Sequence, residues 1–254
     1  MRDGWRLALG MLTVVPARMP GRVDGDVARW AMLLAPLAVL PLGIAVVLVG
    51  VVGTALGLPM LVVGLLGVAA LVLGTRAFHV DGLSDTADGL TASHDPERSL
   101  AAMHTSTSGP AGGAAVFLVL AVQAVALTPL LTGWPGQVLA GALVCVSRLA
   151  LWITCLRGVP AARDGGLAAP YIGRIAPSVA VGGWLAAAAL VAGLLQWAGG
   201  DWWRGVLAVL LAAGFVTALV RRATRRLGGV NGDVFGAGIE LCLATLLVGV
   251  VALG

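Results

Sequence analysis

The sequence has little charge and few reactive side chains. Only 11% of its 254 residues are Asp, Glu, Lys or Arg, and lysine is absent, whereas a soluble domain carries about 25% charged residues. Its three cysteines, Cys145, Cys155 and Cys242, lie in apolar stretches without a C-x-x-C pair, which argues against a zinc site or a disulfide framework. A soluble globule needs a polar surface. The shortage of charge therefore excludes a soluble enzyme, a disordered chain and a nucleic-acid-binding module.

Apolar residues dominate instead. They make up 59% of the chain, and the mean hydropathy is +0.99. This composition predicts an all-α, polytopic integral membrane bundle forming a single domain over residues 1–254. A helical span needs about 20 apolar residues, and seven segments qualify: 31–56, 58–77, 112–132, 136–156, 177–198, 203–220 and 236–253. Pro36 and Pro41 predict a kink in the first span. The N-terminal residues predict a short interfacial helix anchored by Trp5, which we favour over a signal peptide.

The arginines support seven spans. Fourteen of the sixteen fall in segments that seven spans place on one side of the membrane, Arg204 falls on the other side, and Arg148 lies inside the fourth span. Positively charged loops face the cytoplasm, so the N-terminus is predicted to be cytoplasmic. The net charge of +4 is then a topology signal rather than a sign of a nucleic-acid partner. Almost all acidic residues fall on the same side, with Asp201 as the exception, which places any chemistry at the cytoplasmic face.

The most informative motif is Phe78-His79-Val80-Asp81-Gly82-Leu83-Ser84-Asp85-Thr86-Ala87-Asp88-Gly89. If the second span continues as a helix, Asp81, Asp85 and Asp88 share one face at i, i+4 and i+7. Three carboxylates at a helix C-terminus repel one another and oppose the helix dipole, unless a hard cation such as Mg²⁺ binds them. The alternative is a solvated acidic helix end. His79 is predicted to orient an aspartate or line the pocket, with an interfacial histidine as the alternative.

A second motif runs from Arg221 to Leu241. Four arginines, including Arg225 and Arg226, precede a glycine-rich turn with Asn231 and Gly232, which then opens a helix. Free N–H groups at a helix N-terminus bind anions, so this segment is a candidate phosphate site. Asp233 and Glu240, at i and i+7, are candidates for completing the metal site. The alternative is a basic anchor for anionic lipid followed by a flexible turn.

Two weaker candidates belong to the same face. Ser106 lies in the polar stretch from Thr105 to Gly113, which either holds phosphate or is a plain loop. Arg148 is an intramembrane charge and therefore a functional candidate, although its side chain could also snorkel to the cytoplasmic surface.

Taken together, these motifs resemble the cobalamin synthase (adenosylcobinamide-GDP ribazoletransferase) family along nearly the whole chain. The resemblance rests on HVDGLSDTADG and LGGVNGDVFGAGIEL, with support from LTVVP at 12–16, VSR at 146–148 and GLAAPYIGRI at 166–175. One departure concerns Met103-His104-Thr105-Ser106, where the family usually has a basic residue, an Asp and a Ser after Met. Because Thr105 cannot replace a carboxylate ligand, this segment lacks the acid that the family pattern has there.

The resemblance implies a Mg²⁺-dependent reaction in the bacterial inner membrane. α-Ribazole, or its 5′-phosphate, attacks adenosylcobinamide-GDP, cobalamin or its 5′-phosphate forms, and GMP leaves. On this basis, Asp85 and Asp88 would hold Mg²⁺ against the pyrophosphate, and Asp81 would be a further ligand or the base. Asp233 and Glu240 would complete the metal site, and Arg174, Arg225 and Arg226 would bind phosphate. A homo-oligomer, or a complex with other cobalamin-assembly enzymes, is compatible with this role.

Two other functions remain open at this stage. The Asp85-x-x-Asp88-Gly89 core is also similar to that of CDP-alcohol phosphotransferases, although Ser93 stands where that pattern has an Arg. A secondary transporter would explain the kinked span and the intramembrane Arg148. Transporter sites, however, usually lie near the bilayer midplane.

Overall fold

The computed structural model describes residues 1–103, 108–163 and 165–252. Within these ranges the chain is helical, with two isolated β-bridges and no extended strand. The helices are α1 (Arg2–Leu12), α2 (Gly25–Ala38), α3 (Leu40–Ala55), α4 (Met60–Gly74), α5 (Phe78–Ala92), α6 (Pro96–Ala102), α7 (Pro110–Leu130), α8 (Trp134–Ser147), α9 (Ala150–Thr154), α10 (Pro177–Trp197), α11 (Trp202–Leu227) and α12 (Gly232–Val251). The predicted all-α class is confirmed.

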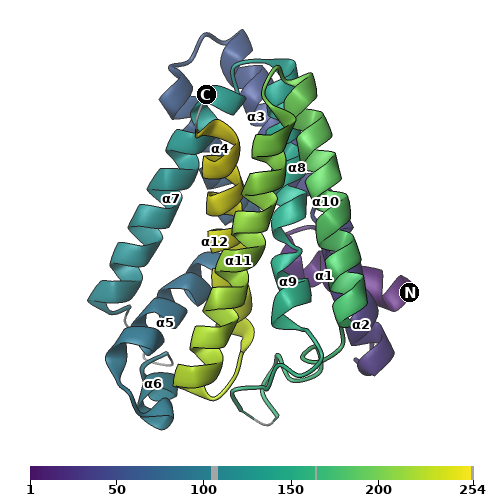
Figure 1. Ribbon diagram of the computed structural model, residues 1–254, viewed down its shortest axis with the longest axis vertical. Helices are drawn as coiled ribbons and strands as arrows, with labels where there is room; N and C mark the ends of the chain where they lie inside the picture. The colour runs from purple at the N-terminus through teal and green to yellow at the C-terminus, as the bar shows by residue number, and fades with distance from the viewer. Residues whose placement is uncertain (104–107, 164, 253–254) are drawn as a thin grey trace.

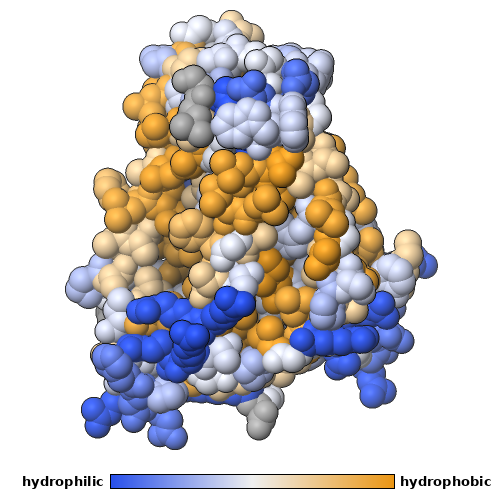
Figure 2. Space-filling model, viewed as in Figure 1, coloured by the Kyte–Doolittle hydropathy of each residue, from blue (hydrophilic) through white to orange (hydrophobic). Residues whose placement is uncertain are grey.

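The predicted multi-pass membrane protein is also confirmed. Six helical segments are long and apolar enough to cross a bilayer, and the bent pair α4–α5 makes a seventh if it counts as one span. Figure 2 shows an apolar band across the middle of the visible face, between a strongly hydrophilic lower end and a smaller polar group at the upper end. We call the lower end, which carries α5, α6 and the start of α2, the polar end (Figure 1).

The predicted kink in the first span is confirmed. The helix breaks at Val39, between α2 and α3, and Pro41 lies in the first turn of α3. Proline lacks the N–H that would continue the hydrogen-bond ladder. The fourth span is interrupted as well, at Arg148 and Leu149 between α8 and α9.

The second span does not continue into the acidic motif, and this part of the prediction is wrong. The chain bends by 90° between α4 and α5. Arg76 and Ala77 both adopt positive φ angles of 56° and 59°, a conformation that a continuous α-helix excludes. The aspartates therefore lie on a separate helix at the polar end. Asp81 is in its first turn, where the helix dipole favours an acid.

The sixth span is longer than predicted. Residues 221–226 were expected to form a loop, but they are the last turns of α11. The helix ends only at Gly228, whose φ is +79°, because arginines favour a helix C-terminus and the first helix-breaking residue is that glycine.

The predicted N-terminal helix is confirmed as α1, but its apolar face does not face lipid. Leu7, Ala8 and Leu12 are buried, and α1 packs along α2. A Cβ atom added at Gly4 would lie 3.0 Å from the backbone nitrogen of Ala31. Trp5 is 37% exposed on the outer side. Helix α1 therefore covers the beginning of the first span.

Helix α12 forms the centre of the bundle. It packs against α5, α7, α8, α9 and α11, and most of its residues are buried. Figure 1 shows α12 enclosed by α7, α11 and α8, with α5 crossing near its lower end. This arrangement brings the start of α12 to the acidic helix.

Candidate active site

The two long sequence motifs meet where α5 crosses α12. A Cβ atom added at Gly82 would lie 2.7 Å from the carbonyl oxygen of Asp233, and one added at Gly236 would lie 3.0 Å from the Cα of His79. Only glycine allows backbones to approach this closely. The glycines in the motifs thus bring Asp81 and Asp85 next to Asp233, although these residues are about 150 positions apart in the sequence.

The carboxylates act on one another electrostatically. Partial burial, followed by the charges of Asp81, Asp233 and Asp88, raises the pKa of Asp85 to about 6. Helix α5 lies at the polar end, outside the apolar band. Asp81 is exposed and Asp85 and Asp233 are partly exposed. Like charges gathered at an accessible position favour the binding of a cation or a proton.

Asp88 holds the start of α7. Its two carboxylate oxygens accept hydrogen bonds from the backbone N–H groups of Gly109, at 2.7 Å, and Gly112, at 2.8 Å. The Ser84 and Ser108 hydroxyls are 2.6 Å apart beside this contact. An acid at a helix N-terminus satisfies free N–H groups and the helix dipole. Sequence reasoning missed this cap, although Gly109-Pro110 is a recognisable helix start.

The predicted metal ligands do not form a preformed coordination shell in the structure. In the described ranges, no three His, Cys, Asp or Glu side chains are grouped closely enough to hold a metal ion. The donor set nevertheless fits a hard cation, because Asp81, Asp85 and Asp233 supply the oxygen ligands that Mg²⁺ prefers and mutual repulsion acts on Asp85. The magnesium site stays a prediction.

Glu240 faces the interior of the bundle instead of the aspartates. Its carboxylate accepts a hydrogen bond of 2.8 Å from Gln123 Nε2 and lies 3.7 Å from His79 Nδ1. All three side chains are buried. This cluster ties α5, α7 and α12 together, so His79 and Glu240 have structural partners. Gln123, a polar residue within an apolar span, was the signal that sequence reasoning did not use.

Arg148 is buried where α8 breaks before α9. It is 1% exposed, and its Nη1 donates to the Val144 carbonyl and the Ser147 hydroxyl at 3.0 and 2.8 Å. Its charge acts on Glu240. Arg148 therefore balances a buried carboxylate, and its side chain does not snorkel to the surface.

The two arginines predicted to bind phosphate at the end of α11 diverge. Arg226 Nη2 donates to the carbonyl oxygens of Leu90 and Ser93 at the C-terminus of α5, a favourable position for a cation. Arg225 lines an open groove with Arg221 and Arg222 on α11. The structure thus gives Arg226 a capping role and leaves Arg225 exposed.

Asn231 and Gly232 lie where the sequence predicted, at the start of α12. The Asn231 side chain accepts from the Val234 N–H and donates to Asp233 Oδ2 at 2.8 Å, which orients that carboxylate. Both residues, together with Asp233 and Arg163, line a cavity of about 260 Å³. Arg163 is a cation that sequence reasoning did not select.

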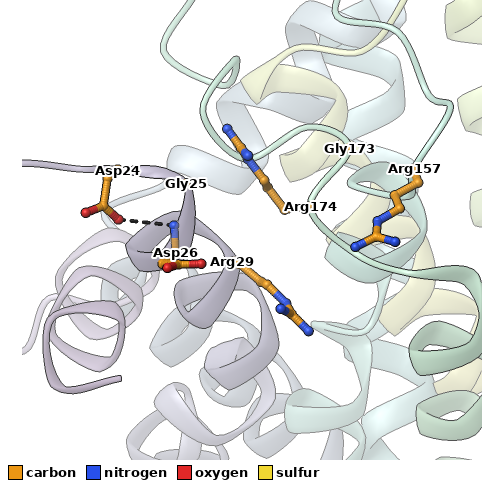
Figure 3. Close-up of a pocket in the computed structure, with 7 residues that line it drawn as sticks. All are labelled: Asp24, Gly25, Asp26, Arg29, Arg157, Gly173 and Arg174. Atoms are coloured by element: carbon orange, nitrogen blue, oxygen red, sulfur yellow. Dashed lines mark hydrogen bonds between the residues drawn. The ribbon is translucent and has the colours of Figure 1, made fainter.

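Arg174 and Ser106 are the remaining candidates. Arg174 lines a different cavity, next to α2 (Figure 3). Ser106 lies outside the described residues.

Comparison with known proteins decides the family. Residues 4–251 match the family model described as cobalamin-5-phosphate synthase. The chain belongs to this family. A protein of Nocardioides sp. named adenosylcobinamide-GDP ribazoletransferase is 52% identical over 98% of both chains. A Frankia casuarinae protein of the same name is 37% identical, covering 96% of this chain and 92% of its own length. One from Corynebacterium efficiens is 33% identical over 98% and 90%. No solved structure matches this chain significantly.

The match to the cobalamin-5-phosphate synthase family confirms the resemblance seen in the sequence. It covers both the α5 motif and the α11–α12 motif. The structure adds that these two motifs pack directly against one another.

Proposed function

We propose that the protein is an adenosylcobinamide-GDP ribazoletransferase in cobalamin synthesis. The family match and the full-length relatives support this reaction. The structural observation that carries it is the approach of acidic α5 to the start of α12 at Gly82 and Asp233. A match along the whole chain favours this reaction over a CDP-alcohol phosphotransferase or a secondary transporter.

In the proposed reaction, a hydroxyl oxygen of α-ribazole, or of its 5′-phosphate, attacks the phosphorus next to cobinamide. The bond from that phosphorus to the GMP oxygen breaks. Cobalamin, or its 5′-phosphate, forms and GMP leaves. Phosphoryl transfer of this kind depends mainly on positioning and charge neutralisation.

We assign the accessible carboxylates to these tasks. Asp85 and Asp233 would hold Mg²⁺, which when bound neutralises charge on the pyrophosphate oxygens. Asp81, exposed in the first turn of α5, would be a further ligand or would accept the proton of the attacking hydroxyl. Asp88 would position α5 against α7. Asn231 would keep Asp233 oriented, and Gly232 with Arg163 would line the approach to it.

The decisive experiment follows GMP release by the purified full chain from adenosylcobinamide-GDP and α-ribazole with Mg²⁺. We expect Asp85→Asn to lower the rate at least about a hundredfold, since a positioned charge of this kind contributes several kcal/mol to catalysis. Asp95→Asn is a matched control, because Asp95 caps α6 through the Glu97 and Arg98 N–H groups. Full activity of Asp85→Asn with Mg²⁺ chelated would refute the assignment.

We further propose that the polar end faces the cytoplasm of a bacterial inner membrane, as the distribution of arginine favours. Single cysteines at positions 98 and 201, in a background without the native cysteines, test this orientation, because both residues are exposed at opposite ends. A membrane-impermeant maleimide added to intact cells should label position 201 and leave position 98 unlabelled. Association into a homo-oligomer, or with other cobalamin-assembly enzymes, remains a proposal for crosslinking in membranes.

A further inference from the structure

A second charged cavity opens at the polar end, away from the acidic helix. It has a volume of about 600 Å³ and is lined by the first residues of α2, by Arg157 after α9 and by the turn before α10. In Figure 1, α2 lies on the right of the lower end and α5 on the left. The α5 aspartates do not line this cavity.

Three arginines from different segments surround the space. Arg29 comes from α2, Arg157 follows α9, and Arg174 precedes α10. In Figure 3, Arg29 and Arg157 extend toward one another from facing elements. The Arg174 guanidinium lies over the first turn of α2, since a Cβ atom added at Gly25 would be 2.7 Å from its Nη1.

Among the described residues, these three arginines form no close ion pair with a carboxylate. The ion pairs within 4.0 Å in that part of the chain join Arg6 to Asp3, Arg204 to Asp201 and His79 to Glu240. Two carboxylates, Asp24 and Asp26, also line the cavity, and one oxygen of Asp24 accepts the N–H groups of Asp26 and Val27 and so caps α2. Three arginines against two carboxylates leave the cavity with an excess of positive charge, which a bound anion would offset.

The backbone holds the arginines in place. The Arg157 N–H donates to the Ile175 carbonyl at 2.9 Å, and the Ile175 N–H donates to the Cys155 carbonyl at 3.0 Å. Arg157 and Arg174 thus sit on two paired segments. Gly173 has a φ of +76°, which favours glycine, and Arg174 Nε donates to the Pro170 carbonyl at 2.9 Å. This last bond holds the Arg174 guanidinium, and a guanidinium that is already held loses less entropy when it binds a ligand.

We propose that Arg29, Arg157 and Arg174 form a phosphate-ester site separate from the acidic centre. The planar guanidinium fork matches phosphate oxygens. The cavity is larger than a single phosphate ion, so the ligand is a phosphate group carrying a further substituent. A nucleotide and an anionic phospholipid headgroup both have this chemistry. The first span starts here with α2, so both could reach the site.

The test measures binding rather than turnover, so its result does not depend on the proposed reaction. In one arm, GDP is titrated into the purified full chain in neutral detergent with EDTA. In the other arm, the chain is inserted into phosphatidylcholine nanodiscs with and without phosphatidylglycerol, and retained phosphatidylglycerol is measured. The variants are Arg29→Gln, Arg157→Gln, Arg174→Gln and the triple variant. Arg22→Gln is the matched control, because it removes the same charge from an exposed position outside the cavity.

We expect each single variant to weaken binding about tenfold in one arm, which corresponds to about 1.4 kcal/mol, and the triple variant to abolish it. Loss confined to the GDP arm identifies a nucleotide site, and loss confined to the phosphatidylglycerol arm identifies a lipid site. Arg22→Gln should bind like the wild type. The proposal is overturned if the wild type binds neither probe, or if well-folded single variants bind both probes as tightly as the wild type.

Discussion

The contact between α5 and α7 offers a sharp test of how the acidic centre is held. Gly112 lies against the Asp88 carboxylate and the Ser84 side chain, and a Cβ atom added there would lie 2.8 Å from the Ser84 carbonyl oxygen. In Gly112→Ala, α7 must therefore move away from α5. Gly113 is the next residue in the same helical turn, and a Cβ atom added there meets nothing within 4 Å. Gly113→Ala is thus a control that changes the same atoms without a clash.

The magnitude follows from the contacts. Overpacking costs about 1–3 kcal/mol, and losing one hydrogen bond from Gly109 or Gly112 to the Asp88 carboxylate costs about 1.5–3 kcal/mol. Alanine regains about 0.5–1 kcal/mol over glycine in a helix. We therefore expect Gly112→Ala to lower the free energy of unfolding by about 2–4 kcal/mol, whereas Gly113→Ala should raise it slightly.

Two measurements check this prediction. Thermal unfolding in detergent should place the melting temperature of Gly112→Ala roughly 4–8 °C or more below that of Gly113→Ala. GMP release should fall at least about tenfold in Gly112→Ala, because a displacement of about 1 Å in a positioned group can cost a hundredfold in rate. If Gly112→Ala is as stable and as active as Gly113→Ala, Asp88 does not anchor α7 to α5.

Four other outcomes follow from the same structure. Gly82→Ala should reduce GMP release at least about tenfold by pushing α5 off the α12 backbone, while Gly193→Ala, with nothing within 4 Å of the added Cβ, should not. Because the pKa of Asp85 is raised to about 6, its carboxylate is protonated below that pH. Apparent Mg²⁺ affinity in activity titrations should therefore drop about tenfold from pH 7.5 to pH 5, and an unchanged affinity would contradict this. Glu240→Ala should destabilise the protein by about 3 kcal/mol, as measured by thermal unfolding, whereas Glu240→Gln should cost less. Arg226→Gln should lower stability by about 1–2 kcal/mol with little change in the KM for adenosylcobinamide-GDP; a large rise in that KM would instead support a phosphate-binding role.

The predicted helix boundaries were most accurate where the apolar run ends in a strong helix signal. The span predicted at 177–198 is α10, Pro177–Trp197, which starts with a proline in its first turn. The prediction was wrong at residues 75–77, where a threonine, an arginine and an alanine give no local sign of a 90° bend. The bend has a tertiary partner: Arg76 Nη2 donates to the Gly10 carbonyl. Because α1 supplies this contact, the nearby sequence alone could not reveal it.

The candidate residues divide in a similar way. The motifs selected Asp81, Asp85 and Asp233, since several acids in a charge-poor chain stand out, and the structure brings these three acids close enough to act on one another. Partners far apart in the sequence gave the others different roles, as Gly109 and Gly112 did for Asp88 and as Gln123 did for Glu240. Sequence spacing fixes which side chains share a helix face, but it does not say which neighbouring helix supplies a hydrogen-bond donor.

The sequence by itself determined the membrane environment, the helical class and the family, because composition and ordered motifs are properties of the chain alone. Tertiary structure decided which charges meet. It brought α5 against α12 through Gly82 and Gly236, buried Arg148 where its charge acts on Glu240, and gathered Arg29, Arg157 and Arg174 around one cavity. The physical reason is that electrostatic and hydrogen-bonding energies depend on distance and burial. For residues more than a hundred positions apart in the sequence, packing alone sets both the distance between them and their burial.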